Sequence, residues 1–174
     1  VFLSNSDSSK FNLKEALSAF EITLKNSSIC IFGEDLSKFI PPIKPGAALV
    51  NHELIEIKSA IKKAKEVLDL VVSTAEIKQC CQGIMKKIVR ASFCLCVPVI
   101  QEETRNVHLS VLLFSEIYPH MEKIVSQAVF WSQYPSSDTC KITDFLNNEG
   151  SEMLLEVERW MNLYNSKRLQ NLPR

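Results

Sequence analysis

The sequence predicts an all-α protein, an irregular helical bundle of about seven helices, with a short α-solenoid of helical pairs as the alternative architecture. Apolar residues recur every three or four positions along most of the chain, which is the period of an amphipathic helix. No segment alternates apolar and polar residues convincingly, and the chain has only 4 glycines for tight hairpins. No internal repeat is evident either, which favours the bundle over the solenoid.

Residues 1–10 are polar and rich in serine, so we expect them to form a flexible lead-in. The rest of the chain, residues 11–174, is expected to form a single helical domain. Asn12 and Glu15 have the spacing of a capping box, which predicts that the first helix begins at Asn12. The apolar stripe of this helix consists of Leu13, Leu17, Phe20 and Leu24.

A second helix is expected over residues 29–40, with Phe32, Leu36 and Phe39 directed inward. The following segment, residues 41–46, contains three prolines. Because proline lacks an amide donor and restricts the residue before it, we expect this segment to be a Pro-rich linker.

The strongest helical pattern covers residues 54–71. Its apolar side chains, spaced alternately by three and four positions, belong to Leu54, Ile57, Ile61, Ala64, Leu68 and Val71. Such a stripe is typical of a packed core, and a groove for a partner helix presents the same pattern. Ser73 and Glu76 have capping-box spacing, so we expect a kink or a break at Ser73 and Thr74.

The next helix continues the pattern. Its stripe consists of Ile77, Cys81, Ile84, Ile88, Ala91 and Leu95, and we expect Pro98 to end it. A further helix is predicted from about Glu102 to Tyr118. Pro119 is expected to begin the next helix, which carries Trp131, because proline is favoured in the first turn of a helix.

Two helices are expected in the C-terminal part, after a loop over residues 132–140. The first is short and is expected to stop at Gly150, since glycine accepts the left-handed geometry that follows many helices. Ser151 is expected to cap the second. Its inward side chains are predicted to be Leu154, Val157, Met161 and Tyr164.

The composition excludes several classes of function. Hydrophobic residues make up 46% of the 174 residues, and the 20 basic residues equal the 20 acidic ones, so the basic excess typical of proteins that bind nucleic acid is missing. Neither of the Gly-rich phosphate-binding motifs, GxxxxGK[ST] and GxGxxG, is present. No apolar run is long enough for a membrane span, and no signal peptide is recognised. We interpret the chain as a part of a larger protein.

Four of the 6 cysteines lie between Cys80 and Cys96, which raises the question of a metal site or disulfides. On one helix, Cys80 and Cys94 are about 21 Å apart, so they cannot share a zinc ion. Cys81 lies on the apolar stripe with Cys80 and Cys94 beside it, which favours cysteines that act as small apolar core residues. That interpretation implies a reducing compartment, the cytoplasm or the nucleus. The alternative is a secreted, disulfide-bonded helical signalling protein, with a glycosylation acceptor at Asn26.

Catalytic motifs are missing from the sequence. The three histidines, His52, His108 and His120, belong to no HExxH motif, and no GxSxG is present. We therefore predict no enzymatic activity, no catalytic residues, no metal, no cofactor and no small-molecule substrate.

Five residues are candidates for binding a partner. Lys58, Lys62 and Lys65 share one helix face, and Trp131 and Tyr134 are aromatic residues of the type that anchors protein interfaces. The sequence thus predicts a non-enzymatic helical domain for protein–protein interaction, a scaffold or adaptor whose partner is another protein. Besides the secreted alternative, the lysine face leaves open the binding of nucleic acid or another anionic partner.

Overall fold

A computed structural model describes residues 24–25, 29–40, 47–70, 73–100, 104 and 106–170, with side-chain positions for all of these except 47–49, 51–53 and 164–170. The described residues are all-helical and contain no strand, which confirms the predicted class. They form six α-helices, against the seven helices expected: α2 (Ala47–Asp69), α3 (Thr74–Ile100), α4 (Val107–Ile117), α5 (Glu122–Gln133), α6 (Thr139–Asn147) and α7 (Glu149–Gln170). Two short 3₁₀ helices, η2 (Leu36–Phe39) and η3 (Pro119–Met121), complete the elements.

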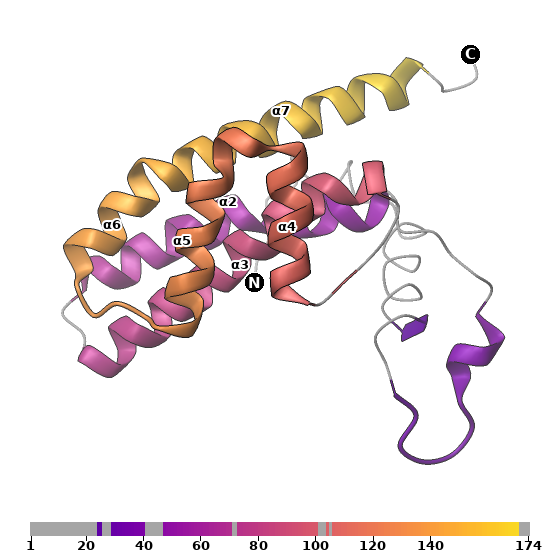
Figure 1. The fold of residues 1–174 in the computed structure, drawn as a ribbon, viewed down its shortest axis with the longest axis horizontal. Coiled ribbons are helices and arrows are strands. Elements are labelled where there is room, and N and C mark those ends of the chain that lie inside the picture. Colours follow the sequence, from indigo (N-terminus) through magenta and orange to yellow (C-terminus); the bar gives the residue numbers. More distant parts are fainter. Residues whose placement is uncertain are drawn as a thin grey trace, which may run out of the picture.

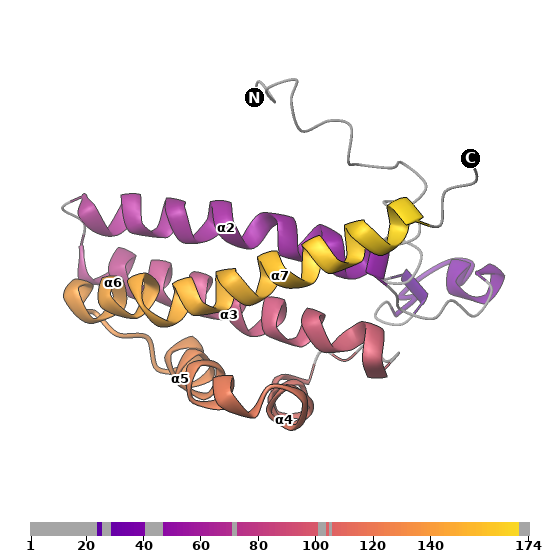
Figure 2. The same ribbon diagram turned by 90° about the horizontal axis from the view of Figure 1, so that it is seen from above.

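Helix α3 is the centre of the structure. Helix α2 packs along one side of it, α4 and α5 pack on the other, and α7 runs across both α2 and α3 (Figure 2). Every side chain from Ala91 to Val97 is buried. A helix that is buried all round in this way cannot have the one-sided stripe of a surface helix.

The end of α3 differs from the expectation. Pro98 does not end the helix, which continues to Ile100. A proline this close to a C-terminus removes one backbone hydrogen bond, and the burial of the preceding seven residues holds the last turn in place. Tertiary packing therefore overrides the local preference.

The apolar stripe of α2 is part of the core. Its five described members are all buried: Leu54, Ile57, Ile61, Ala64 and Leu68. The stripe is therefore not available to bind a partner helix. The last member of the predicted stripe, residue 71, lies outside the described residues.

A capping box separates α2 from α3. The backbone amide of Ser73 donates to Glu76 Oε2 at 2.9 Å, and the amide of Glu76 donates to Ser73 Oγ at 3.4 Å. This reciprocal pair satisfies amides that the first turn of α3 leaves unbonded. The chain therefore breaks at this point rather than kinking, and the hydrogen bonds from Ser73 lower the pKa of Glu76.

The expected helix over residues 29–40 is wrong. Gly33 has a φ of +86°, which interrupts a right-handed helix, and only η2 is helical there. Asp35 caps η2 by accepting from the amide of Ser37 at 3.1 Å. The three side chains expected to point inward, those of Phe32, Leu36 and Phe39, are exposed. The predicted lead-in, the stripe over residues 13–23 and the Pro-rich linker fall outside the described residues.

The turn between α4 and α5 forms as predicted. Pro119 opens η3, and Met121, Ile124 and Ala128 are buried along the inner face. Phe114 of α4 is fully buried, and its ring stacks on that of Tyr118 with centroids 5.0 Å apart. These contacts fix α4 and α5 against α3.

The predicted boundary at Gly150 is wrong. Helix α6 ends at Asn147 and α7 begins at Glu149, so Gly150 and Ser151 lie inside α7 and are neither its stop signal nor its cap. A Cβ at Gly150 would lie 3.7 Å from Leu146 Cδ2 and 3.8 Å from Ile61 Cδ1. These are ordinary contact distances, so a Cβ would fit here, and Gly150 lies where α7 packs against α6 and α2, a tertiary contact that a helix-ending pattern does not reveal.

The contrast between Gly83 and Gly150 gives a stability prediction. Gly83 lies inside α3, and a Cβ there would meet nothing within 4 Å. We expect Gly83→Ala to raise the free energy of unfolding by about 0.5–1 kcal/mol, since it removes chain entropy from the unfolded state without a clash. Calorimetry should show a melting temperature about 2–4 °C higher.

Leucine substitutions provide the control for this prediction. Gly83→Leu should leave stability close to that of the alanine variant, whereas Gly150→Leu should lose about 1–3 kcal/mol through overpacking. If the Gly83→Ala variant were less stable than the parent chain, the space around Gly83 would not be open.

Candidate functional site

An open groove of about 660 Å³ lies between α2 and α3. It is lined on α2 by Glu56, Ser59, Ala60, Lys63, Ala64 and Val67, and on α3 by Glu76, Gln79, Cys80, Gly83, Ile84 and Lys87. Small residues, notably Ala60 and Gly83, lie where the two helices face each other at the surface. They leave a gap that larger residues would fill, and this gap is the groove.

The floor of the groove is apolar. Ile84 is buried, Val67 is partly exposed, and Cys80 is half-buried with its thiol directed to the carbonyl of Ala64 at 3.8 Å. Burial raises the pKa of the Cys80 thiol, which is therefore protonated at neutral pH and a poor nucleophile. The floor offers apolar contact area rather than reactive chemistry.

The rim of the groove is charged. Lys87 Nζ pairs with Glu56 Oε2 at 3.3 Å across the gap, and both side chains are more than half exposed. Lys63 is exposed on the α2 side, and among the described residues it makes no ion pair. An apolar floor inside a charged rim is the arrangement of protein–protein interfaces.

The three lysines predicted to bind a partner lie elsewhere on α2. Lys58 Nζ contacts Glu158 Oε1 of α7 at 2.8 Å, and this hydrogen bond raises the pKa of Lys58. Lys62 pairs with Glu66 at 3.8 Å, and Lys65 is half-buried. None of the three lines the groove, and two are matched with carboxylates, which weakens the positive potential of this face.

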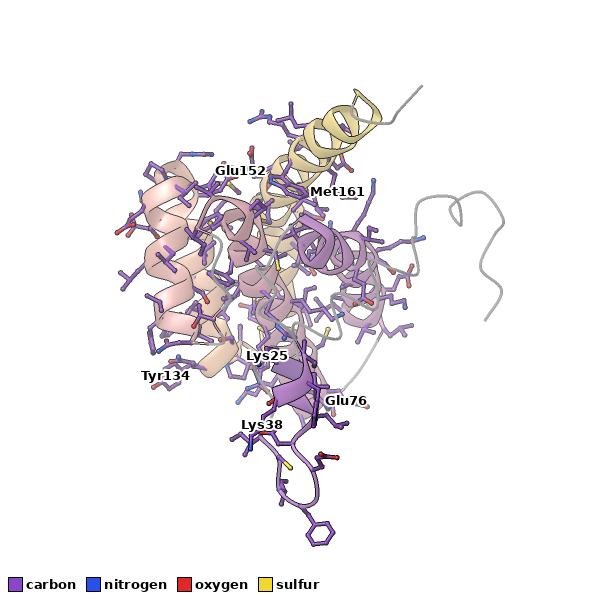
Figure 3. The ribbon with its side chains drawn as sticks, turned by 90° about the vertical axis from the view of Figure 1, so that its right-hand side faces the viewer. Lys25, Lys38, Glu76, Tyr134, Glu152 and Met161 are labelled. Atoms are coloured by element: carbon purple, nitrogen blue, oxygen red, sulfur yellow. The ribbon has the colours of Figure 1, made fainter. Side chains whose placement is uncertain are left out.

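The two predicted aromatic residues have different environments. Trp131 is half-buried, and its ring meets the ring of Phe145 edge-on with centroids 5.3 Å apart, so it joins α5 to α6. Tyr134 is 66% exposed at the end of α5 and packs on Phe130, which is also exposed. Figure 3 shows Tyr134 on the opposite side from Glu76, which lines the groove.

Residues 29–39 form a second unusual surface, which we call the apolar finger. It projects from the helical body beyond the end at which α2 begins (Figure 1). Phe32 at its tip is 98% exposed and Ile31 is 96% exposed, and three further large apolar side chains are exposed along it: Ile29, Leu36 and Phe39. Single exposed apolar residues are ordinary, but five within eleven positions indicate an interaction surface.

Sequence reasoning missed both the groove and the finger. The groove had one usable signal: Ala60, a small residue at the edge of the core stripe of α2, lies four positions before Ala64. The finger had one too, because Gly33 weakens any helix over residues 29–40.

The cysteines lie as the core interpretation predicts. Cys81 and Cys96 are fully buried, Cys94 is buried, and Cys80 packs at the edge of the core. No disulfide links any of the 6 cysteines, all of which the structure describes. Among the described residues, no group of three His, Cys, Asp or Glu side chains is placed to hold a metal ion.

Comparisons with family models, with curated proteins and with solved structures found no match for this chain. Among the described helices, none combines the length and apolar character needed to cross a membrane.

Proposed function

We propose that this is a non-enzymatic helical domain that binds another protein chain, a scaffold or adaptor, and that the α2–α3 groove is its docking surface. The observation that carries the proposal is the groove itself, an open apolar floor inside a charged rim. A surface of this kind favours recognition by contact and does not assemble groups for covalent chemistry.

The dimensions of the groove support this function. It follows α2 from Glu56 to Val67, a length of about 16 Å or three helical turns. Amphipathic helices and short apolar segments bind in grooves of this size through two or three anchoring side chains. The floor residues Ala60, Ala64 and Gly83 allow such a segment to approach the helix backbones closely.

The lysine-based alternative has less support. Lys58 and Lys62 are paired with Glu158 and Glu66, so the face presents balanced charge rather than the basic stripe that nucleic acid requires. We likewise favour the cytoplasm or nucleus over secretion. In support, Cys81 and Cys96 are packed as apolar core residues instead of cross-linking the chain.

The docking proposal is tested by blocking the groove from inside it. Gly83→Trp places a large side chain in the open space above α3, and Gly83→Ala is the matched control at the same position. Proteins captured from cells by the parent chain should be retained by Gly83→Ala and lost by Gly83→Trp. Each candidate is then purified and titrated calorimetrically against both variants, where we expect the tryptophan to weaken binding about tenfold or more.

The result can contradict the proposal in a definite way. Equal binding of every purified partner by Gly83→Trp and Gly83→Ala would show that the groove is not the docking surface. Circular dichroism of the two variants should be the same, because neither substitution enters the core.

A further inference from the structure

We propose that two copies of this chain form a two-fold symmetric dimer in which the apolar finger of each copy docks in the α2–α3 groove of the other. This inference rests on the proposed function of the groove as a docking surface and names its occupant. Both surfaces are present on the same chain, so the dimer needs no further component.

The finger has the chemistry that the groove floor accepts. Its tip presents Ile31 and Phe32, both almost completely exposed, and the positive φ of Gly33 turns the chain directly after them. Cavities of a few hundred Å³ bury two or three large apolar side chains, and the groove measures about 660 Å³. Ile29 lies close enough in sequence to enter with them.

Both the finger and the rim carry charges of both signs, and one pair of opposite charges is available to join them. Glu34 and Asp35 follow the tip, and Asp35 is held by its hydrogen bonds to Ser37, which also lower the pKa of this carboxyl. On the rim, Lys63 has no carboxylate partner among the described residues. A docked tip would place Glu34 beside this lysine, giving the register of the contact and a reason for its specificity.

In Figure 3, Glu76 of the groove and Lys38 of the finger both lie on the side of the body away from Met161 of α7. Along the long axis they are at opposite ends, because the finger projects beyond the end at which α2 begins, whereas Glu76 lies in the first turn of α3 (Figure 1). Two copies placed face to face about a two-fold axis can therefore exchange fingers simultaneously. Such an arrangement is closed, whereas a one-way contact would propagate into a chain of molecules.

The buried area also favours a reciprocal exchange. Three large apolar side chains at one tip bury on the order of 500 Å², and the groove that receives them loses a similar area. One contact thus buries about 1,000 Å² in total, which is below the usual range for a stable complex, and two contacts bury about 2,000 Å², which is within it.

The test measures the mass of the full chain by light scattering after size-exclusion chromatography, at protein concentrations of about 100 μM. We expect twice the 19.7 kDa of one chain for the parent and for Gly83→Ala. Phe32→Asp and Gly83→Trp should each weaken dimerisation by about 30-fold or more and elute as monomers. Leu155→Asp is the matched control, because Leu155 is exposed on α7 and away from both surfaces, and it should remain dimeric.

Mixing the two defective variants tests the exchange directly. Phe32→Asp keeps an intact groove and Gly83→Trp keeps an intact finger, so their mixture should form heterodimers through one remaining contact, more weakly than the parent dimer but more readily than either variant forms a homodimer. Native mass spectrometry with one partner isotopically labelled detects them. Glu34→Lys should weaken the dimer, and adding Lys63→Glu to the same chain should restore it.

The outcomes separate this inference from the proposed function. A monomeric parent chain, or a dimer that survives Phe32→Asp, overturns the exchange of fingers. If Gly83→Trp still abolishes binding of other proteins to a monomeric parent chain, the groove remains a docking surface for them. A dimer lost in both variants, with binding of other proteins unaffected by Gly83→Trp, would instead limit the groove to self-association.

Discussion

Phe114→Ala should lower the free energy of unfolding by about 3–5 kcal/mol, the largest effect that we expect from a single truncation in this protein. Among the residues that the structure describes, Phe114 is the largest of the fully buried side chains, and it lies where α4 packs on the central helix α3. Truncation removes its apolar contacts and leaves a cavity that the neighbouring helices can fill only in part. It also deprives the ring of Tyr118 of its stacking partner.

Equilibrium unfolding in urea, followed by circular dichroism, measures this loss. Leu112→Ala is the control on the same helix, because Leu112 is 64% exposed, and it should change stability by about 0.5 kcal/mol or less. If Phe114→Ala cost no more than Leu112→Ala, Phe114 would not be a packed core residue between α4 and α3.

Alkaline pH should destabilise the protein through Cys96, with a loss of about 2 kcal/mol between pH 9 and pH 11. Cys96 is fully buried in α3, and burial raises the pKa of its thiol from 9.0 to about 12. The unfolded chain releases this proton near pH 9, while the folded chain retains it. The stabilisation is therefore complete below pH 9 and is lost as the pH rises toward 12.

Urea unfolding at half-unit steps from pH 8 to pH 11, with a reductant present, gives the slope of stability against pH. Cys96→Ala should flatten this slope by about 1.4 kcal/mol per pH unit, whereas Cys140→Ala should leave it unchanged, because Cys140 is exposed. Burial also raises the pKa of Tyr118 to about 12, so part of the slope above pH 10 should persist in the Cys96 variant. Parallel slopes for all three proteins would contradict the burial of Cys96.

Helical periodicity was enough to predict the class of the fold and most of its helices. The stripe from Leu54 to Leu68, the capping box at Ser73 and the turn at Pro119 all depend on interactions within a few residues of one another. Local interactions of this kind are readable from sequence because the spacing determines which side chains share a face.

Predictions failed where contacts between distant segments decide the structure. Pro98 stays within α3 because the seven residues before it are buried, and Gly150 lies inside α7 where this helix packs against α6 and α2. Neither reason is visible in the residues next to the proline or the glycine. The predicted helix over residues 29–40 failed for a local reason, the left-handed turn at Gly33.

The candidate site was the least predictable part. The five residues chosen from the sequence were selected by charge and aromatic character, and the structure places Trp131 partly in the core and pairs Lys58 and Lys62 with carboxylates. The groove depends instead on two small residues, Ala60 of α2 and Gly83 of α3, and on the space that the two helices leave around them. Shape of this kind emerges only once the helices are packed.

The position of α7 has a consequence for how the protein is made. Lys58 and Glu158 meet although they are 100 residues apart, and Met153 and Val157 help to cover α2 and α3. While the ribosome is still synthesising α7, the apolar surfaces that it will cover are exposed on the nascent chain. Chaperones that recognise apolar segments would therefore have access to α2 and α3 until Met153 and Val157 of α7 have emerged from the ribosome and packed.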